Sequence, residues 1–319
     1  MIVHDDRARS CPRCGMAQQA QGAQGAQGAQ EAAMATWSWI GVGVLALAGA
    51  ALALHFVGER RWQRATQELR LQLEASRQSL PITRLPQGEL DALPPPVQRY
   101  LRAALPASAP RVATVELRHE GSFDIREEGQ RWLPFASRQH VQTRRPGFVW
   151  DARMPVAPGL AVHVHDAYIG GEGLLHPSVA GLVSLAEQRS GGDFARDELM
   201  RFLAESPWYP TALLPGQGVR WTAIDEGSAR ATLVDGPHEV SLVFVFGADG
   251  MVESVRADAR GRSLRGQLVP TPWEGRWQAY ETRCGMRVPT RGEVAWLLPE
   301  GRKPYWRGQL VEMRCAFAE

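Results

Sequence analysis

Residues 37–57 form an apolar run that a water-soluble fold rarely accommodates. This run, Trp37–Val57, holds 21 residues without Asp, Glu, Lys or Arg, and His55 is its one ionisable member. At about 1.5 Å per residue such a helix is roughly 31 Å long, which matches the hydrocarbon core of a bilayer. Tryptophans stand at its start and arginines follow its end, as is typical of residues that meet lipid headgroups. The sequence therefore predicts one uncleaved transmembrane helix over residues 37–57.

The charges that flank this run bear on its orientation. Residues 16–36 before it contain no Lys or Arg, whereas three arginines follow it closely: Arg60, Arg61 and Arg64. By the positive-inside rule this asymmetry puts the C-terminal part of the chain in the cytoplasm. Arginines near the start of the chain, and a large domain after the span, favour the opposite orientation. The sequence thus predicts a single-pass protein of the cell membrane and leaves the side of the C-terminal domain open.

Residues 1–36 have the composition of a tail without a packed core. A Gln-Gly-Ala repeat occupies residues 18–30 and contains no branched apolar residue, so a disordered tether is expected. Ahead of it, Cys11 and Cys14 have the spacing of half a zinc knuckle. No second pair of that spacing follows, so a zinc site here would need a second copy of the chain or a nearby histidine.

Residues 58–92 are expected to form a juxtamembrane helix followed by a proline-rich connector. Over residues 59–80 the positions spaced alternately four and three apart form one face: Trp62, Thr66, Leu69, Leu73, Ser76 and Leu80. Two of the six are polar, which favours a short stalk or a helix docked on a domain over a stable coiled coil. Prolines at positions 81, 86 and 94–96 then stiffen the connector.

From residue 93 to residue 319 the pattern changes to short alternating segments separated by Gly, Pro and Asp, which is typical of an antiparallel sheet. About a dozen strands are expected between residues 112 and 313. The most specific hairpin joins residues 239–246 to residues 252–257 through Gly247 and Gly250. One helical block is expected over residues 179–204, with Asp193 as N-cap of its second half. The prediction is therefore one α+β domain, a large curved and mostly antiparallel sheet with a few packed helices.

Several motifs of this region resemble an uncharacterised bacterial family, family 6544 of the domains of unknown function. The similarity extends from Leu93 to Phe317 and rests on motifs that recur in order: residues 132–135, 146–152, 166–168, 203–205, 208–215, 272–273 and 292–296. The resemblance implies a membrane-anchored domain and brings no reaction with it. At the level of the fold, a curved sheet with inserted helices is also similar to periplasmic lipoprotein carriers.

Aromatic residues of the β-rich region are the candidate ligand-binding residues. If their rings share one concave face, they would line an apolar groove for a lipid or lipoprotein. Filling of the core between sheet and helices is the alternative for each of them. The loop aromatics that follow the helical block are expected at a rim or lid. The candidates are Trp132, Phe135, Trp150, Tyr168, Trp208, Tyr209, Trp221 and Trp296.

A metal-assisted hydrolase is the alternative function, with His163, His165 and Asp166 as ligands. Residues two apart in a strand share a face, so both imidazoles could reach one metal with a carboxylate nearby. A solvated or hydrogen-bonded histidine pair is the other interpretation. A third possibility is a non-catalytic, membrane-tethered interaction module whose apolar residues are all used by the core.

Other function classes lack their signatures. Basic and acidic residues number 36 and 34, a balance that does not favour nucleic-acid binding. No Gly-x-Ser-x-Gly or phosphate-binding glycine pattern occurs in a suitable context, so no cofactor is expected and an enzyme is less expected than a binding protein. Cys284 and Cys315 either form a disulfide in an oxidising compartment or are buried thiols. The oligomeric state stays open.

Overall fold

The computed structural model describes residues 12–79, 84, 88–107, 109–126, 129–265 and 267–318, with the backbone alone for residues 12–36, 38 and 40. It divides into two units, Met1–Val57 and Gly58–Glu319. Helix α1 (Pro12–Ala75) contributes to both units.

In the first unit α1 is the described element, and its apolar side chains are exposed. Leu45 and Leu47 are each 73% exposed. The stretch of α1 from Gly41 onward is long and apolar enough to cross a membrane. The helix begins at Pro12, so its backbone includes residues 12–36, for which the sequence predicts disorder. Cys11 lies outside the described residues.

In the second unit the end of α1 docks on the β domain through the predicted face. Leu69 and Leu73 pack against Val149, Ala167 and Leu174. Trp62 and Thr66 are also buried, and the Trp62 indole N–H donates to Asp151 Oδ1 at 2.8 Å. The docked helix expected from the heptad-like spacing is therefore present.

The β domain is a single antiparallel sheet in which the first and last long strands meet at the centre. The strand order is β6-β5-β4-β3-β2-β1-β14-β13-β12-β11-β10-β9-β8, and β7 pairs with β5. The strands are β1 (Val112–Asp124), β2 (Trp132–Gln142), β3 (Gly147–Ala157), β4 (Leu160–Ile169), β5 (Glu172–Val179), β6 (Val183–Ser184), β7 (Gln188–Ser190), β8 (Val219–Ala223), β9 (Ser228–Asp235), β10 (His238–Phe246), β11 (Val252–Leu264), β12 (Gln267–Arg283), β13 (Met286–Leu298) and β14 (Gly301–Phe317).

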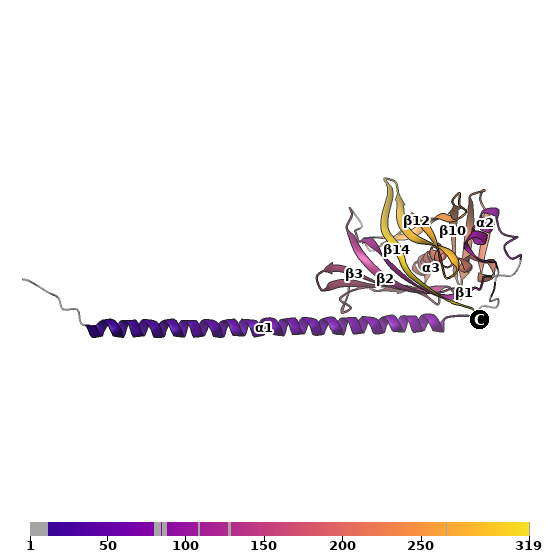
Figure 1. Ribbon diagram of the computed structural model, residues 1–319. Coiled ribbons are helices and arrows are strands. Elements are labelled where there is room, and N and C mark those ends of the chain that lie inside the picture. Colours follow the sequence, from indigo (N-terminus) through magenta and orange to yellow (C-terminus); the bar gives the residue numbers. More distant parts are fainter. Residues whose placement is uncertain are drawn as a thin grey trace, which may run out of the picture. The chain divides into compact units, whose positions relative to one another are not determined.

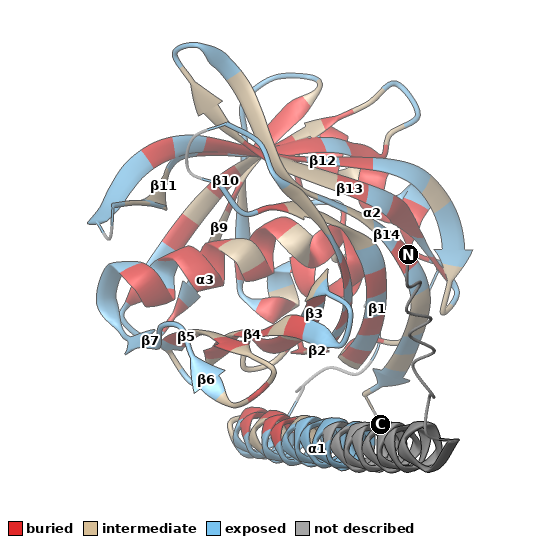
Figure 2. Cartoon of the chain, turned by 90° about the vertical axis from the view of Figure 1, so that its left-hand side faces the viewer, coloured by how far each residue is buried: buried red, intermediate tan, exposed pale blue. Residues whose placement is uncertain are grey.

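The sheet curls around one central helix. Helix α3 (Gly192–Glu205) contacts β3, β4 and β5 on one arm of the sheet and β10 and β11 on the other. Figure 1 shows the long strands of the curl, and Figure 2 shows α3 enclosed by it with buried residues on its packed side. Helix α2 (Pro95–Ala104) packs against β9 and β13, and three short 3-10 helices follow α3: Ser206–Trp208, Pro210–Leu213 and Pro215–Gln217. The α+β class with a large curved antiparallel sheet is confirmed.

Three glycines in register lie where the two arms of the sheet join. Gly121 of β1 pairs with Gly308 of β14, which pairs with Gly292 of β13. A Cβ at Gly308 would overlap the Trp306 ring, and one at Gly292 would overlap the Trp277 ring. Only glycine lets these indoles lie directly over the backbone of the neighbouring positions.

Two local predictions had different outcomes. The hairpin from β10 to β11 is confirmed, because Gly247 N–H donates to the Met251 carbonyl at 2.8 Å and the strands pair. The helix predicted over residues 179–204 is wrong in its first half. Ala180 and Gly181 have positive φ, which a right-handed helix does not tolerate, and β6 and β7 pair with β5 instead. Helix α3 begins at Gly192, and its N-cap is Gly191. Asp193, which was predicted as the N-cap, lies in the first turn of the helix.

Docking of α1 predicts different effects for two leucines two residues apart. Leu69 is 6% exposed and Leu71 is 62% exposed. We expect Leu69→Ala to lower the free energy of unfolding of the β domain by about 2–4 kcal/mol, because it leaves a cavity. Leu71→Ala is the matched control and should change it by less than about 0.5 kcal/mol. Denaturant unfolding followed by tryptophan fluorescence measures both, and equal effects would show that α1 does not stabilise the domain.

Candidate ligand cavity

A cavity of about 430 Å³ lies between α3 and the concave face of the sheet. Its volume is in the usual range for small-molecule sites. Among the described residues that line it, six are tryptophans: Trp150, Trp208, Trp273, Trp277, Trp296 and Trp306. Phe123, Phe194, Tyr305, Leu175, Leu268 and Val294 add to its apolar wall. The chain has 11 tryptophans in total, so more than half of them are concentrated here.

The indoles pack on one another in a fixed arrangement. Trp208 meets Trp277 edge to face at 4.8 Å between ring centroids, and Trp306 meets Trp208 at 6.3 Å. The Trp208 N–H donates to the Pro289 carbonyl at 3.0 Å. At another part of the wall Trp296 stacks on Tyr305 at 5.3 Å. Such contacts favour single ring orientations, so the apolar wall is preorganised.

A buried ion cluster holds α3 to the sheet beside the cavity. Arg201 of α3 donates to Asp166 Oδ2 of β4 at 2.5 Å and to Glu205 Oε1 at 2.7 Å. Gln139 of β2 donates to the other Glu205 oxygen at 2.6 Å. The Arg201 guanidinium also lies over the Phe148 ring, 4.7 Å from its centroid. Because these charges are paired and nearly buried, removing one partner would leave the other charges buried without compensation.

A second set of charges comes from the next turn of α3. Glu198 lies 3.7 Å from Arg260 of β11, and Asp197 Oδ2 accepts from the Gly261 N–H at 3.0 Å. Burial raises the pKa of Glu198 well above its usual value, and the neighbouring Asp166 carboxylate raises it further. Glu198 Oε2 and Asp166 Oδ1 are buried without a hydrogen-bond partner among the described residues. Glu198 is therefore a buried carboxyl of the cavity wall whose environment favours the protonated form.

Three of the eight predicted ligand residues line the cavity: Trp150, Trp208 and Trp296. Trp150 lies beneath Arg201, 5.2 Å from its guanidinium carbon. Trp208 is 2% exposed, so it belongs to the interior wall and not to the exposed rim expected from its loop. It is buried because the 3-10 helix Ser206–Trp208 follows α3 directly and turns the ring inward.

The other five lie outside the cavity. Phe135 is a core residue between Trp150 and Trp306, and Trp132 is half-buried beneath the Arg307 guanidinium. Hydrogen bonds hold the remaining three elsewhere. The Tyr168 hydroxyl donates to Asp235 Oδ2, the Tyr209 hydroxyl to the Phe202 carbonyl, and the Trp221 indole N–H to the Leu213 carbonyl. For Phe135, Tyr168, Tyr209 and Trp221, which belong to the core or pack against it, the structure favours the core-filling interpretation. Trp132 lies outside that core cluster.

Sequence reasoning missed Trp273, Trp306 and Tyr305 among the lining residues. A signal existed for two of them, because Trp273 is followed two residues later by Gly275, and Trp306 by Gly308. Residues two apart share a face of a strand, and a glycine beside a tryptophan leaves room for the ring to lie over the backbone.

His163 and His165 lie on the opposite face of β4, beneath α1. The His165 ring stacks on Trp62 at 3.7 Å, and its Nε2 is 2.7 Å from Thr66 Oγ1. His163 Nε2 is 3.5 Å from Glu59. Burial lowers the pKa of His165 to about 3, and nearby His176 and His163 lower it too. These rings therefore help to dock α1.

The predicted ligand set His163, His165 and Asp166 is not brought together. Successive residues of a strand point to opposite faces, and Asp166 faces the cavity, where it binds Arg201. Within the described residues no group of three or more His, Cys, Asp or Glu side chains is placed to hold a metal ion. Of the cysteine pair, Cys11 lies outside the described residues and only the backbone of Cys14 is described.

The model of a protein family of unknown function, DUF6920, matches residues 91–314, which is more than two thirds of the chain. The chain belongs to this family. The expectation of an uncharacterised domain family is thus confirmed, and its number is 6920 where the motifs suggested 6544. The matched residues include α2, α3 and the whole sheet up to the last residues of β14.

No curated protein matches the chain. Among solved structures, the crystal structure of a LolA superfamily protein from Nitrosomonas europaea is similar at 10% sequence identity and a TM-score of 0.29. The similarity covers 69% of this chain and 92% of the other.

The raised pKa of Glu198 predicts a pH-dependent stability. Its stabilising contribution is complete below the unfolded-state pKa, near 4.5, and is lost as the pH rises through the higher folded-state value. Glu198→Gln stays neutral at every pH. We therefore expect the variant to gain stability relative to wild type between pH 5 and pH 8, by at most about 1.4 kcal/mol per pH unit.

Denaturant unfolding at both pH values measures this difference. Glu253→Gln is the matched control, because Glu253 is exposed on β11. Parallel pH dependence of wild type and Glu198→Gln would contradict a raised pKa of Glu198.

Proposed function

We propose that this protein is a membrane-anchored binding protein that holds the apolar part of a lipid or lipoprotein between α3 and the sheet. The observation that supports this most is the cavity of about 430 Å³ with six indoles in its wall. A domain whose apolar residues served only as core would fill this space, because protein interiors leave few voids larger than a water molecule. The cavity therefore favours ligand binding over a solid interaction module.

The size of the cavity limits the ligand. At about 430 Å³ the cavity lies in the lower part of the range for small-molecule sites, which favours one acyl chain over the two chains of a phospholipid. We infer that a single chain enters the cavity.

Helix α1 would keep this cavity close to its source of ligand. Its apolar stretch passes the criteria for a membrane span, and the same helix continues into the second unit, where Leu69 and Leu73 are part of the domain's packing. We propose that α1 is a single-pass anchor for the binding domain.

We further propose that the domain lies on the oxidising side of the membrane. Cys284, in the turn between β12 and β13, forms a disulfide with Cys315 of β14, with their Cα atoms 6.2 Å apart. Structural disulfides persist in oxidising compartments and are rare in the cytosol. The arginines after the span favour the cytoplasm, but long folded domains translocate largely regardless of flanking charge. The disulfide is therefore the stronger argument.

Blocking the cavity tests the binding role. Val294 of β13 is half-buried in the cavity wall, and Val294→Trp would occupy the space of the ligand. We expect at least a tenfold loss of affinity for cis-parinaric acid, about 1.4 kcal/mol, measured by energy transfer from tryptophan with the full chain in a non-ionic amphipol.

The matched control is Val234→Trp, because Val234 is 46% exposed on β9 and the change adds the same fluorophore. It should bind the fatty acid as wild type does. Equal affinities of the two variants, or no binding by wild type, would remove the proposal.

Counting the reactive thiols in cells before and after reduction tests on which side of the membrane the domain lies. In a Cys11→Ser/Cys14→Ser background only Cys284 and Cys315 remain. We expect no modification by a maleimide-polymer reagent before reduction and two additions after it, read as gel shifts. Cys315→Ser in the same background should expose one reactive thiol without reduction. Two additions to the unreduced parent protein would place the domain in the cytoplasm.

A further inference from the structure

The β5–β6 turn of the domain lies directly against Gly58 of α1. Gly58 is the residue that follows the apolar run in the sequence. A Cβ at Gly58 would overlap the Ala180 carbonyl oxygen, and a Cβ at Gly181 would overlap the Gly58 carbonyl oxygen. The Ala180 N–H donates to the Ala161 carbonyl at the start of β4, at 2.9 Å. The β5–β6 turn and the adjoining β3–β4 turn therefore lie at the Gly58 end of the docked helix.

Both turns, with the strand ends beside them, are uncharged and expose large apolar side chains. Residues 154–164 and 177–186 contain no Asp, Glu, Lys or Arg. Leu160 is 40% exposed, Val183 60% and Leu185 57%, and Figure 2 shows β6 as an exposed element. Strands β4, β5 and β6 are neighbours in the sheet, so these three side chains belong to one surface. We call Leu160, Val183 and Leu185 the apolar edge.

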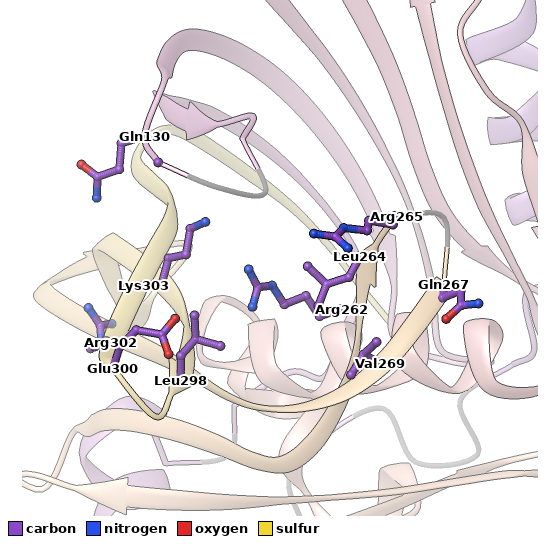
Figure 3. Close-up of a pocket in the computed structure, with 12 residues that line it drawn as sticks. Gln130, Arg262, Leu264, Arg265, Gln267, Val269, Leu298, Glu300, Arg302 and Lys303 are labelled. Carbon is purple, nitrogen blue, oxygen red and sulfur yellow. The ribbon is translucent and has the colours of Figure 1, made fainter.

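Hairpin tips elsewhere in the sheet carry charged residues instead. Arg265 lies in the β11–β12 turn, and Glu300 and Lys303 lie at the β13–β14 hairpin (Figure 3). The connection from β1 to β2 contains Arg126 and Arg131. Charged side chains at sheet tips and edges are usual where a sheet meets water. The apolar edge therefore differs from the tips that have the composition of a water-exposed surface.

The charged residues of α1 begin just after Gly58. Arg60, Arg61 and Arg64 are exposed on α1. Guanidinium groups on long apolar stems reach lipid headgroups from the end of a membrane span. Along the chain an apolar run of bilayer length thus comes first, then Gly58 with the apolar edge beside it, and then the arginines. This order matches the change from acyl chains to headgroups.

We propose that the apolar edge inserts into the interfacial region of the bilayer that α1 spans. This inference rests on the proposed role of α1 as an anchor and adds a second contact of the β domain with the membrane. The region between hydrocarbon core and water is roughly 5–8 Å thick on each side, so a turn that touches the first residue after the span falls within it. Burying apolar side chains there is favourable, and no charge has to be desolvated.

Depth-dependent quenching of one label tests the contact. In a Cys11→Ser/Cys14→Ser background, Val183→Cys is labelled with nitrobenzoxadiazole, while the disulfide keeps Cys284 and Cys315 unreactive. The full chain is reconstituted in vesicles of phosphatidylcholine and phosphatidylglycerol. A nitroxide near the carbonyl end of the lipid acyl chains should quench at least about half of the emission, because interfacial segments lie roughly 5–10 Å into the headgroup and acyl boundary.

The matched control carries the same label at Val234→Cys. Val234 is 46% exposed on β9, and its neighbour Asp235 accepts from the Tyr168 hydroxyl at the other end of β4. This label should keep its emission in the same vesicles. Equal emission from the two labelled proteins would overturn the membrane contact of the apolar edge.

Added charge at the apolar edge gives a second measurement. Leu160→Asp/Leu185→Asp in the labelled Val183→Cys protein should abolish the quenching, because two carboxylates oppose insertion. Ile224→Asp/Val234→Asp is the matched control, since these residues are 49% and 46% exposed elsewhere on the domain, and it should leave the quenching unchanged. Quenching that persists in both variants would overturn the proposal. All four sites are exposed, and thermal unfolding verifies that the variants fold.

The remaining outcomes separate this contact from the anchor and from a protein partner. A full chain that does not float with the vesicles after an alkaline carbonate wash removes the anchor role itself. Flotation without quenching at Val183 leaves the anchor in place and overturns the contact of the apolar edge with lipid. Energy transfer between labels on two copies, maintained on dilution with lipid and without nitroxide quenching, would assign the apolar edge to a second copy of the chain.

Discussion

The row of glycines across β1, β14 and β13 is the constraint on which the cavity depends. Gly308 and Gly292 leave the space in which the Trp306 and Trp277 rings lie against the sheet. A side chain at either position would push an indole into the hollow, where six tryptophans already form the wall. Because the same row lies at the junction of the two arms, one sequence feature determines both the close packing at the centre of the curl and the free volume beside it.

The two faces of the sheet have separate tasks, and β4 shows the division most clearly. His163, His165 and Ala167 face α1, where they meet Trp62, Thr66 and Leu69. Asp166, between them, faces α3 and binds Arg201. Alternation along one strand therefore connects α1 to the outer face and the ion cluster to the inner face. It also explains why Asp166 does not join His163 and His165 in the part of the chain that the structure describes.

Much of the local structure was predictable, because local periodicity and turn chemistry decide it. The buried face of α1 and the β10–β11 hairpin were read from spacing and glycine positions. The structure of the first half of the helix expected over residues 179–204 was not predictable, because positive φ at Ala180 and pairing of β6 with β5 depend on tertiary contacts. Among the cavity residues, Trp150, Trp208 and Trp296 were identified, whereas Phe135, Tyr168 and Trp221 resembled them in sequence and belong to the core.

The sequence by itself determined the bilayer-length apolar helix, its docked continuation and the alternation of the strands, since each depends on neighbours within a few residues. The tertiary structure alone decided which aromatic residues face a hollow. Strand alternation defines two faces, but which face is concave depends on the pairing of β1 with β14, from Val112↔Phe317 to Phe123↔Trp306. That pairing joins the first and last long strands of the domain, and contacts so distant along the chain leave no local pattern by which to recognise them.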